Sequence, residues 1–357
     1  MRALVTRGAG ERLAVEDVVL PPVGAGDVRV EVRAAGVCHS DLSMLNGTLA
    51  PEFPLVLGHE AAGVVAEIGS GVSRVAVGDH VVLNWSPACR SCWFCERGEP
   101  WLCERGGVPS VPRGSLRDGT PLHVTLGLGA LADQVVVPAN AVVPVPAVLP
   151  FASAALLGCA VLTGFGAVRT TAAVSPGDAV AVIGLGGVGL SVVAAAHAAG
   201  ASPIVAVDPV EAKRELALRA GATEFVVPGD TLIKQVRALT GGRGADHAFE
   251  CVGRGETIWT AWRLTRRGGA ATVIGIGRRD DQVSFSAAEL FHSGRTLRSS
   301  IYGSSDPDAD LPALARAVLD GALDPDVLVT HRVSLDEAPA AFERMQRGEG
   351  ARTLVTP

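Results

Sequence analysis

The second half of the chain alternates short apolar runs with helical patterns, and this rhythm restricts the fold more than any other feature. The alternation starts after the S-P-G-D run at residues 175–178 and includes AVAVIG, PIVAVD, EFVV, DHAFEC and AATVIG. Buried strands separated by crossover helices form a parallel sheet with helices on both faces. A further strand near residues 296–301 would make six. The sequence therefore predicts an α/β, doubly wound parallel-sheet domain over residues 161–300.

A glycine-rich turn follows the first of these strands and opens an Ala-rich helix. It consists of Gly184, Leu185, Gly186, Gly187, Val188 and Gly189. In such a turn the glycines permit a sharp bend, close approach of a pyrophosphate and tight helix packing, while the helix N-terminus supplies N–H donors. The next strand ends at Asp208, whose carboxylate can bind ribose hydroxyls and repel a 2′-phosphate. A turn without a nucleotide is the alternative, but the flanking strand and helix favour an NAD site.

The first ~150 residues contain many short β segments broken by Gly and Pro, which is typical of an irregular, barrel-like β domain. Examples are residues 28–36, 60–69 and 79–85. From Asp306 the chain returns to helix and strand and ends in ARTLVTP. We expect this tail to rejoin the first domain, which would then comprise residues 1–160 and 301–357.

Four of the seven cysteines form a cluster, Cys89-x-x-Cys92-x-x-Cys95-x₇-Cys103. Four thiolates at this spacing can close a tetrahedral site around a structural Zn²⁺. An iron–sulfur cluster is the chemical competitor. The seven-residue gap, and the absence of a proline after Cys103, favour zinc.

A dispersed set of residues can form a second metal site. Cys38, His59 and Cys159 would together bind a zinc ion and leave one position open for water or substrate, although no spacing rule joins the three. In the sequence they lie in GVCHSDL, GHEAAGVV and GCAVLTGFGA. With the four-cysteine segment, GLGGVG, VDPVEAK and the terminal GARTLV, these motifs resemble those of the zinc-containing medium-chain alcohol dehydrogenases, in the same order and over essentially the whole chain.

That resemblance implies a GroES-like catalytic domain, a Rossmann domain, two zinc ions per chain and a set of roles around the catalytic zinc. Cys38, His59 and Cys159 would be its ligands, with Glu60 beside it as a transient ligand. Asp41 would fix the tautomer of His59. Ser40 would take the proton of the alcohol. Many family members have a histidine three residues beyond this position, whereas this chain has Ser43, so the proton must leave through water or another base.

The resemblance also implies residues for cofactor and substrate. His39 and Arg352 would face the pyrophosphate, Thr163 and Val188 would flank the nicotinamide, Lys213 and Arg254 would lie near the adenosine, and Trp85 would line the substrate pocket. We therefore expect hydride transfer between NAD(H) and a primary alcohol or aldehyde. VVLNWSPACRSC and SSIYGSSDPDADLP are similar to the branch with mycothiol-dependent formaldehyde dehydrogenases. Oxidation of a thiol–formaldehyde adduct or reduction of a biosynthetic aldehyde is thus an alternative, and a non-catalytic NAD-binding protein is another.

The segment at residues 104–125 bears on this choice. Arg105, Arg113 and Arg117 could meet a substrate carboxylate there, or could be solvated loop charges.

Charge and hydropathy exclude other classes. The net charge of −6 and the lack of a Lys/Arg run speak against nucleic-acid binding. Two uncharged stretches, residues 134–162 and 179–207, contain prolines or the glycine turn, so we expect no membrane-spanning helix. The N-terminus lacks a signal-peptide pattern, which predicts a cytoplasmic protein with reduced thiols.

The sixth strand predicts assembly. An unpaired edge near residues 298–302, with Leu297 and Ile301, would pair with a second copy, giving a homodimer or a dimer-based tetramer. An edge covered by the chain's own C-terminal segment is the alternative.

Overall fold

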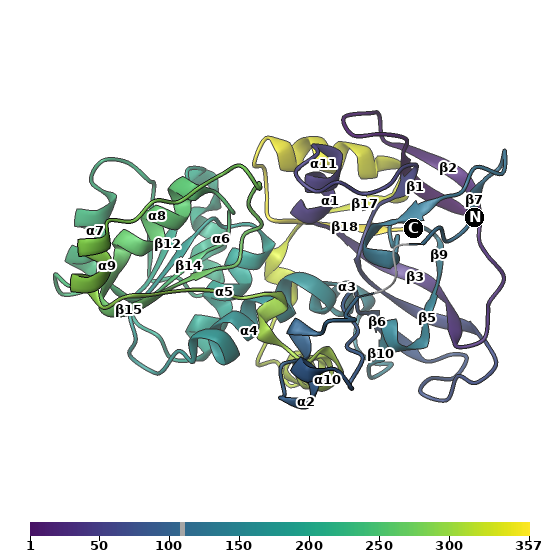
Figure 1. Cartoon of the computed structure of the whole chain (residues 1–357), viewed down its shortest axis with the longest axis horizontal. Helices are drawn as coiled ribbons and strands as arrows, with labels where there is room; N and C mark the ends of the chain where they lie inside the picture. Colours follow the sequence, from purple (N-terminus) through teal and green to yellow (C-terminus); the bar gives the residue numbers. More distant parts are fainter. Residues whose placement is uncertain (108–110) are drawn as a thin grey trace. The chain divides into compact units, whose positions relative to one another are not determined.

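The computed structural model describes residues 1–107 and 111–357, and the chain divides into two compact units, which Figure 1 shows coloured along the sequence. The first unit comprises Met1–Leu162 with Asp306–Pro357, and the second comprises Thr163–Ser305. The predicted α/β fold class, with a GroES-like and a Rossmann domain, is confirmed.

The first unit is built around two curled sheets. A seven-stranded sheet runs in the order β10 (Val142–Pro144), β6 (His80–Leu83), β5 (Glu60–Ile68), β3 (Asp27–Val37), β18 (Arg352–Thr356), β17 (Val329–Ser334), with β9 (Gln134–Pro138) also paired to β3. A five-stranded sheet has the order β7 (Ser115–Leu116), β2 (Ala14–Val19), β1 (Arg2–Thr6), β4 (Leu55–Val56), β8 (His123–Val124). Along β3 valines alternate with charged residues, so one face enters the core, as a half-buried strand requires.

The C-terminal tail completes the first unit. Strand β18 pairs antiparallel with β3 and parallel with β17, which brings residues 353–355 beside residues 35–37. Leu335, Phe342 and Val355 join the same hydrophobic core as Val28 and Val30. The remaining helices of this unit are α1 (His39–Leu45), α2 (Trp93–Glu96), α3 (Phe151–Leu156), α10 (Pro307–Leu319) and α11 (Ala338–Gln346).

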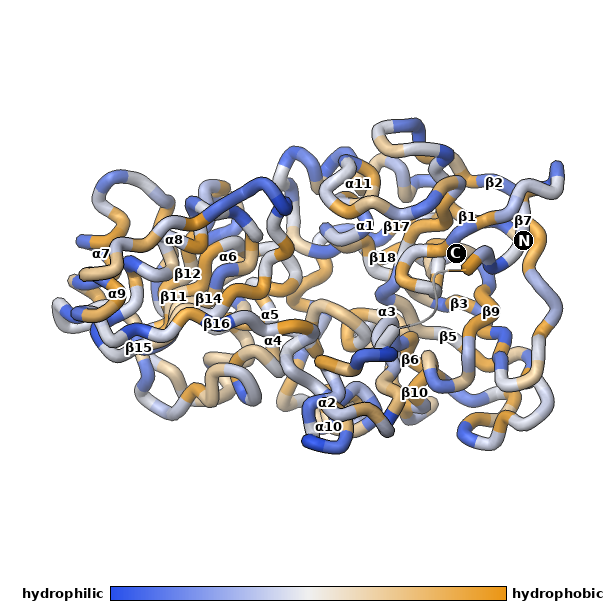
Figure 2. Tube along the Cα trace, viewed as in Figure 1, coloured by the Kyte–Doolittle hydropathy of each residue, from blue (hydrophilic) through white to orange (hydrophobic). Residues whose placement is uncertain are grey.

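The second unit is a six-stranded parallel sheet. Its order is β13 (Glu224–Val226), β12 (Ile204–Val207), β11 (Val180–Ile183), β14 (Ala245–Glu250), β15 (Thr265–Val273), β16 (Thr296–Ser299). The crossover helices are α5 (Gly187–Ala198), α6 (Arg214–Arg219), α7 (Leu232–Leu239), α8 (Gly255–Leu264) and α9 (Ala287–Ser293). Strands β11 and β12 are buried at every position, and Figure 2 shows hydrophobic residues along β11. Strand order reverses between β11 and β14, where such sheets bind ligands at the strands' carboxyl ends.

The sixth strand is shorter than we expected. It ends at Ser299, before Ile301, because Tyr302, Gly303 and Ser304 adopt left-handed backbone conformations that turn the chain. Strand β16 has β15 as its only partner among the described residues, so it forms the predicted edge of the sheet.

One long helical run covers the end of the first uncharged stretch. Residues 151–172 form α3, η4 (Leu157–Val161), α4 (Leu162–Gly166) and η5 (Ala167–Ala172) without a break, directly after Pro150. By length and composition this run could cross a membrane, but 83% of its most apolar window is buried inside the protein. Such burial is the property of a core helix.

Candidate active site

Three potential zinc ligands meet inside the first unit. Cys38 lies between β3 and α1 as the N-cap of α1, His59 precedes β5, and Cys159 lies in the π-helical turn η4. Their ligand atoms all lie within 4.8 Å of one another, and all three residues are buried. Two sulfurs and one imidazole nitrogen are a donor set that suits Zn²⁺, and three protein ligands leave a fourth position for a reactant.

The local fold explains why Cys159 reaches the other two. A Cβ atom at Gly158 would lie 2.9 Å from the carbonyl oxygen of Leu83 and 3.0 Å from the Val82 side chain. Only glycine therefore allows η4 to approach β6 this closely. The Sγ of Cys159 then lies 3.4 Å from Nε2 of His59.

Asp41 orients both His59 and the chain around Cys38. Its Oδ1 lies 3.2 Å from Nδ1 of His59 and accepts a hydrogen bond from the Gly58 N–H at 2.9 Å, while its Oδ2 accepts from the Cys38 N–H at 3.2 Å. The carboxylate is fully buried. With Nδ1 engaged by Asp41, Nε2 is the nitrogen left to face a metal.

Glu60 and Arg352 form a buried ion pair beside these ligands. Arg352 Nη2 lies 3.2 Å from Glu60 Oε2 and 3.5 Å from Cys38 Sγ. Burial raises the pKa of Glu60 to about 7, although Arg352 opposes the change. The hydrogen bond from Cys159 holds the pKa of Cys38 well below its ordinary value against the effect of burial, and the charge of Arg352 acts in the same direction. The cluster thus favours a thiolate at Cys38.

Glycine again makes room for a functional group here. A Cβ atom at Gly36 would lie 2.3 Å from Glu60 Oε1, so the carboxylate fits only because residue 36 has no side chain. That same oxygen is buried and has no hydrogen-bond partner in the described part of the chain. An unpartnered carboxylate oxygen beside three potential ligands fits a group that can also contact a cation.

The other predicted residues of this unit are placed as follows. Ser40 Oγ lies 3.8 Å from Cys38 Sγ, His39 is exposed, and Ser43 is buried. Trp85 is half-buried and packs against the hydrophobic core of the unit. The guanidinium of Arg352 lies against Cys38 and Glu60, so a contact with the cofactor's pyrophosphate stays a prediction for this residue.

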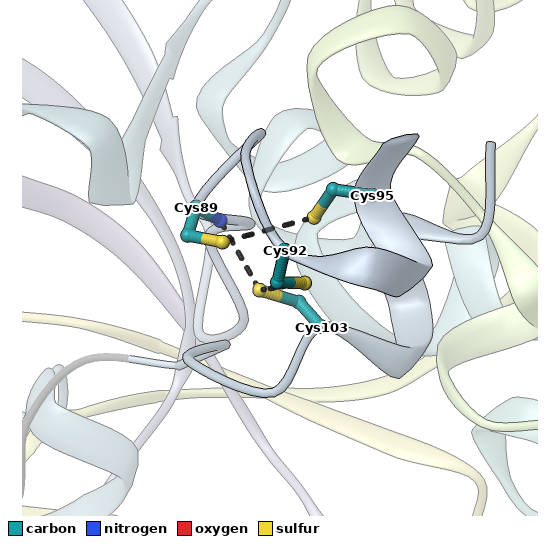
Figure 3. Close-up of side chains that lie close together, drawn as sticks. All are labelled: Cys89, Cys92, Cys95 and Cys103. Carbon is teal, nitrogen blue, oxygen red and sulfur yellow. Dashed lines mark hydrogen bonds between the residues drawn. The ribbon is translucent and has the colours of Figure 1, made fainter. Parts of the chain in front are cut away.

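The four remaining clustered cysteines form a second potential metal centre, shown in Figure 3, in which their side chains point toward one another. All four sulfurs lie within 4.8 Å of one another. Cys92 and Cys95 belong to the start and the body of α2, and Cys103 follows η1 (Pro100–Leu102). The Ser91 backbone N–H lowers the pKa of Cys89 to about 5. Four thiols with no other donor match a closed structural zinc site.

Arg90 fastens this centre to the C-terminal part of the unit, a role the sequence did not reveal. Its Nη1 and Nη2 donate to the two carboxylate oxygens of Asp306 at 2.6 Å, and Nη2 also donates to Asp308 at 2.6 Å. Asp306 caps α10, and α10 contacts η4, the turn that carries Cys159.

The glycine turn of the second unit has the geometry of a dinucleotide site. Gly184 has a φ of 87°, and a Cβ at Gly189 would lie 1.8 Å from the Gly184 carbonyl oxygen. A Cβ at Gly186 would meet nothing within 4 Å, and this residue is exposed at the N-terminus of α5. The first and third glycines are thus needed for packing, and the second leaves open space where a pyrophosphate could approach.

Asp208, which follows β12, binds the backbone of the glycine turn that follows β11. Its Oδ2 accepts from the Leu185 N–H at 2.8 Å and from Lys213 Nζ at 3.2 Å, and its Oδ1 accepts from the Val210 N–H at 2.9 Å. Among the other predicted cofactor residues, Thr163 is buried, Val188 is half-buried on α5, and Arg254 is exposed at the start of α8.

Comparison with known proteins agrees with these sites. Residues 24–147 match the model of the alcohol dehydrogenase GroES-like domain, and residues 187–320 match that of the zinc-binding dehydrogenase family. The chain is 37% identical, over 99% of both chains, to S-(hydroxymethyl)glutathione dehydrogenase of Escherichia coli O1:K1 / APEC. The chain belongs to the zinc-dependent medium-chain alcohol dehydrogenase family. The predicted family is therefore confirmed, and so is the prediction that the chain is a zinc-dependent oxidoreductase.

Two solved structures show the same family fold. Benzyl alcohol dehydrogenase from Acinetobacter calcoaceticus superposes with a TM-score of 0.91 at 28% identity, covering 99% of this chain and 98% of the other. A zinc-binding dehydrogenase from Sinorhizobium meliloti 1021, solved bound to NADP, superposes with a TM-score of 0.84 at 27% identity, covering 100% and 99%.

Glu250 is a residue of this family member that sequence reasoning missed. It ends β14, is buried, and its Oε1 accepts hydrogen bonds from the Val252 N–H, the Gly253 N–H and Thr257 Oγ1, each at 2.8 Å. Burial raises its pKa. The carboxylate fixes the loop after β14, and a Cβ at Gly184 would meet Val252 of that loop at 2.5 Å. An acidic residue at the end of an otherwise buried strand was the available signal.

The arginines of the 104–125 segment have structural partners. Arg105 donates to Ser91 Oγ at 2.8 Å, Arg113 to the Val136 carbonyl at 3.3 Å, and Arg117 to Asp17 at 2.8 Å. Residues 108–110 of this segment lie outside the described part of the chain. The contacts of these arginines point to structural roles and give no support to the idea that they bind a substrate carboxylate.

Proposed function

We propose that the chain catalyses NAD-linked hydride transfer between a primary alcohol and its aldehyde. The single observation that carries this proposal is the buried trio of Cys38, His59 and Cys159, whose ligand atoms lie within 4.8 Å of one another. When bound, zinc would polarise the oxygen of the alcohol or aldehyde, and the nicotinamide would exchange the hydride.

The chain's own residues would hold and discharge the reactants. Asp41 keeps Nε2 of His59 directed at the metal position. Ser40, with its hydroxyl 3.8 Å from Cys38 Sγ, would accept the alcohol proton. Because position 43 is a buried serine, that proton would pass from Ser40 to water. Trp85 would line the pocket for the carbon chain.

The second unit would supply the cofactor site. The open space at Gly186 and the N-terminus of α5 suit a pyrophosphate, which His39 and Arg352 would face. Thr163 and Val188 would flank the nicotinamide, while Lys213 and Arg254 would lie near the adenosine. The carboxylate of Asp208 favours NAD over NADP through repulsion of a 2′-phosphate. The NADP in the Sinorhizobium meliloti structure makes cofactor preference the first property to measure.

A thiol–formaldehyde adduct is the second substrate proposal, and the 37% identity to S-(hydroxymethyl)glutathione dehydrogenase favours it. A cytoplasmic location is part of the proposal, because thiols stay reduced there and can hold both zinc ions. The exposed edge of β16 supports a homodimer or a dimer-based tetramer.

The proposal is tested by a coupled NAD(H) assay of primary alcohols, aldehydes and thiol–formaldehyde adducts, with metal content measured on the same sample. We expect two zinc ions per chain and turnover of simple alcohols or aldehydes with NAD. Turnover of the adducts alone would select the second substrate class. One zinc ion per chain and no turnover with any class would indicate a non-catalytic protein.

A further inference from the structure

A hollow lies between helices α7 and α8 of the second unit, which are adjacent in Figure 1. Its volume is about 560 Å³, which is within the range of small-molecule sites. Its wall includes Asp230, Lys234, Arg237, Trp259 and Arg263. The glycine turn, Asp208 and Lys213 contribute nothing to this wall. We call it the α7–α8 pocket.

The α7–α8 pocket gathers positive charge that is not balanced within the protein. Lys234 and Arg237 lie one turn apart on α7, whose buried residues Leu232 and Val236 face the core. Arg263 lies on the last turn of α8. In residues 1–107 and 111–357 none of the three cations forms an ion pair, and Asp230 is the one acidic residue in the wall. Lys234 and Arg237 are exposed and three positions apart on one helix, so they repel each other weakly, and an anion bound beside them would relieve that repulsion.

Besides burial, the positive charge of the pocket lowers the pKa of a neighbouring arginine, Arg295. Burial lowers the pKa of Arg295, and Arg237 and Arg263 lower it further, although Glu289 lies 3.3 Å away and opposes them. The positive charge of the pocket therefore extends to a half-buried side chain next to it.

The pocket also offers an aromatic surface. Trp259 is half-buried, and its ring packs against Phe285 with the ring centroids 5.4 Å apart. A planar ring beside two guanidinium groups and an ammonium group suits a ligand that has a flat ring and several phosphate oxygens.

We propose that the α7–α8 pocket binds a nucleoside polyphosphate at a site separate from the dinucleotide turn. Lys234, Arg237 and Arg263 contact the phosphates, and Trp259 stacks on the base. The chain's net charge of −6 and the concave shape of the site favour a small ligand over a nucleic acid.

The test is calorimetric titration of ATP, and separately of inorganic pyrophosphate, into the full chain saturated with NADH, at an ionic strength fixed with NaCl. NADH occupies the dinucleotide turn, so added heat reports a second site. The pocket variant is Arg237→Ala/Arg263→Ala. The matched control is Arg219→Ala/Arg243→Ala, which removes two exposed arginines of the same unit that are not part of the pocket wall.

We expect one ATP per chain. Affinity should fall at least about tenfold in the pocket variant, because each charge-assisted hydrogen bond contributes roughly that factor. The control should bind as the wild type does. Trp259→Leu should weaken ATP binding but not pyrophosphate binding. Lys234→Glu, at an exposed position, repeats the test if the double variant does not fold.

Two results would overturn the proposal. One is the absence of ATP and pyrophosphate binding to the wild type, or equal binding in the pocket and control variants. The other is tight binding of a single-stranded oligonucleotide that the pocket variant loses while ATP does not bind. The difference in ATP affinity between the pocket variant and the control variant does not depend on whether NADH is the cofactor. This proposal can therefore fail while the proposed function stands, and the reverse is also true.

Discussion

Arg352 Nη2 lies 3.2 Å from Glu60 Oε2, and this ion pair joins the last strand of the chain to the residue next to His59. The arginine is 4% exposed and the glutamate is fully buried. Breaking a buried pair from one side leaves a charge without a partner, which costs roughly 3–5 kcal/mol. If Glu60 is removed, Arg352 keeps its contact with the Cys38 sulfur, so the loss of free energy of unfolding should lie at the lower end of that range.

The first prediction follows from this pair. Glu60→Ala should lower the free energy of unfolding by about 3 kcal/mol, and Glu60→Ala/Arg352→Met should lower it less, because both charges are then removed. Urea denaturation of the zinc-loaded proteins measures both values. If the double variant lost as much free energy of unfolding as Glu60→Ala or more, the two side chains would not stabilise each other.

The second prediction concerns the potential catalytic zinc. Cys159→Ser and His59→Ala should each lose one zinc ion per chain and reduce kcat/KM at least about a hundredfold, while the fold survives. His292→Ala, an exposed histidine on α9, serves as the matched control and should retain both properties. Metal analysis, circular dichroism and the coupled assay are the measurements. Full turnover by a folded Cys159→Ser variant would refute the assignment.

The third prediction separates the second metal centre from the first. Cys103→Ser opens a closed four-thiolate site, so it should lower the unfolding midpoint by at least roughly 5 °C, which is about 2 kcal/mol for a domain of this size. The protein that remains folded should keep the zinc ion held by Cys38, His59 and Cys159. If folded Cys103→Ser lost activity but kept its structural zinc, the two centres would have been assigned the wrong way round.

Much of this molecule could be predicted from the sequence because its signals are local. The parallel sheet and its six strands follow from alternating buried strands and helices, and the Cys89–Cys103 cluster is visible as a spacing. The trio of Cys38, His59 and Cys159 is different, because no spacing connects residues up to 121 positions apart. The family resemblance joined them, and the structure shows how Gly158 and Asp41 bring them together.

The features that were missed depend on tertiary contacts. Nothing in the run C-R-S-C indicates that Arg90 would bind Asp306, because the partners lie 216 residues apart. The end of β16 depends on left-handed residues, of which only Gly303 is a glycine.

The fourth prediction concerns cofactor choice. Asp208→Gly removes the carboxylate and leaves the Lys213 ammonium, now 3.2 Å from Asp208 Oδ2, free to attract a 2′-phosphate. The ratio of kcat/KM for NADP to that for NAD should rise at least about tenfold, which is ~1.4 kcal/mol. Glu211→Gln, an exposed acid on the same loop, is the control. An unchanged ratio would contradict the placement of Asp208 at the ribose.

The fifth prediction is that two copies of the chain associate through strand β16. Strand β16 is an edge strand, Leu297 is 42% exposed and Ile301 is 49% exposed. Among the described residues the C-terminal strand β18 pairs with β3 and β17, and β16 pairs with β15. A two-fold axis at β16 would bury both apolar side chains and continue the sheet across the subunits.

Light scattering at micromolar concentration measures the assembly, and a monomeric mass for the wild type would refute it. Ile301→Lys places a charge in the proposed contact and should yield a monomer, because a buried unpaired ammonium opposes association. Leu319→Lys is the matched control, since Leu319 is 41% exposed at the end of α10, in the first unit. If Ile301→Lys stayed dimeric while Leu319→Lys dissociated, the subunits would associate through the first unit and not through the edge of the parallel sheet.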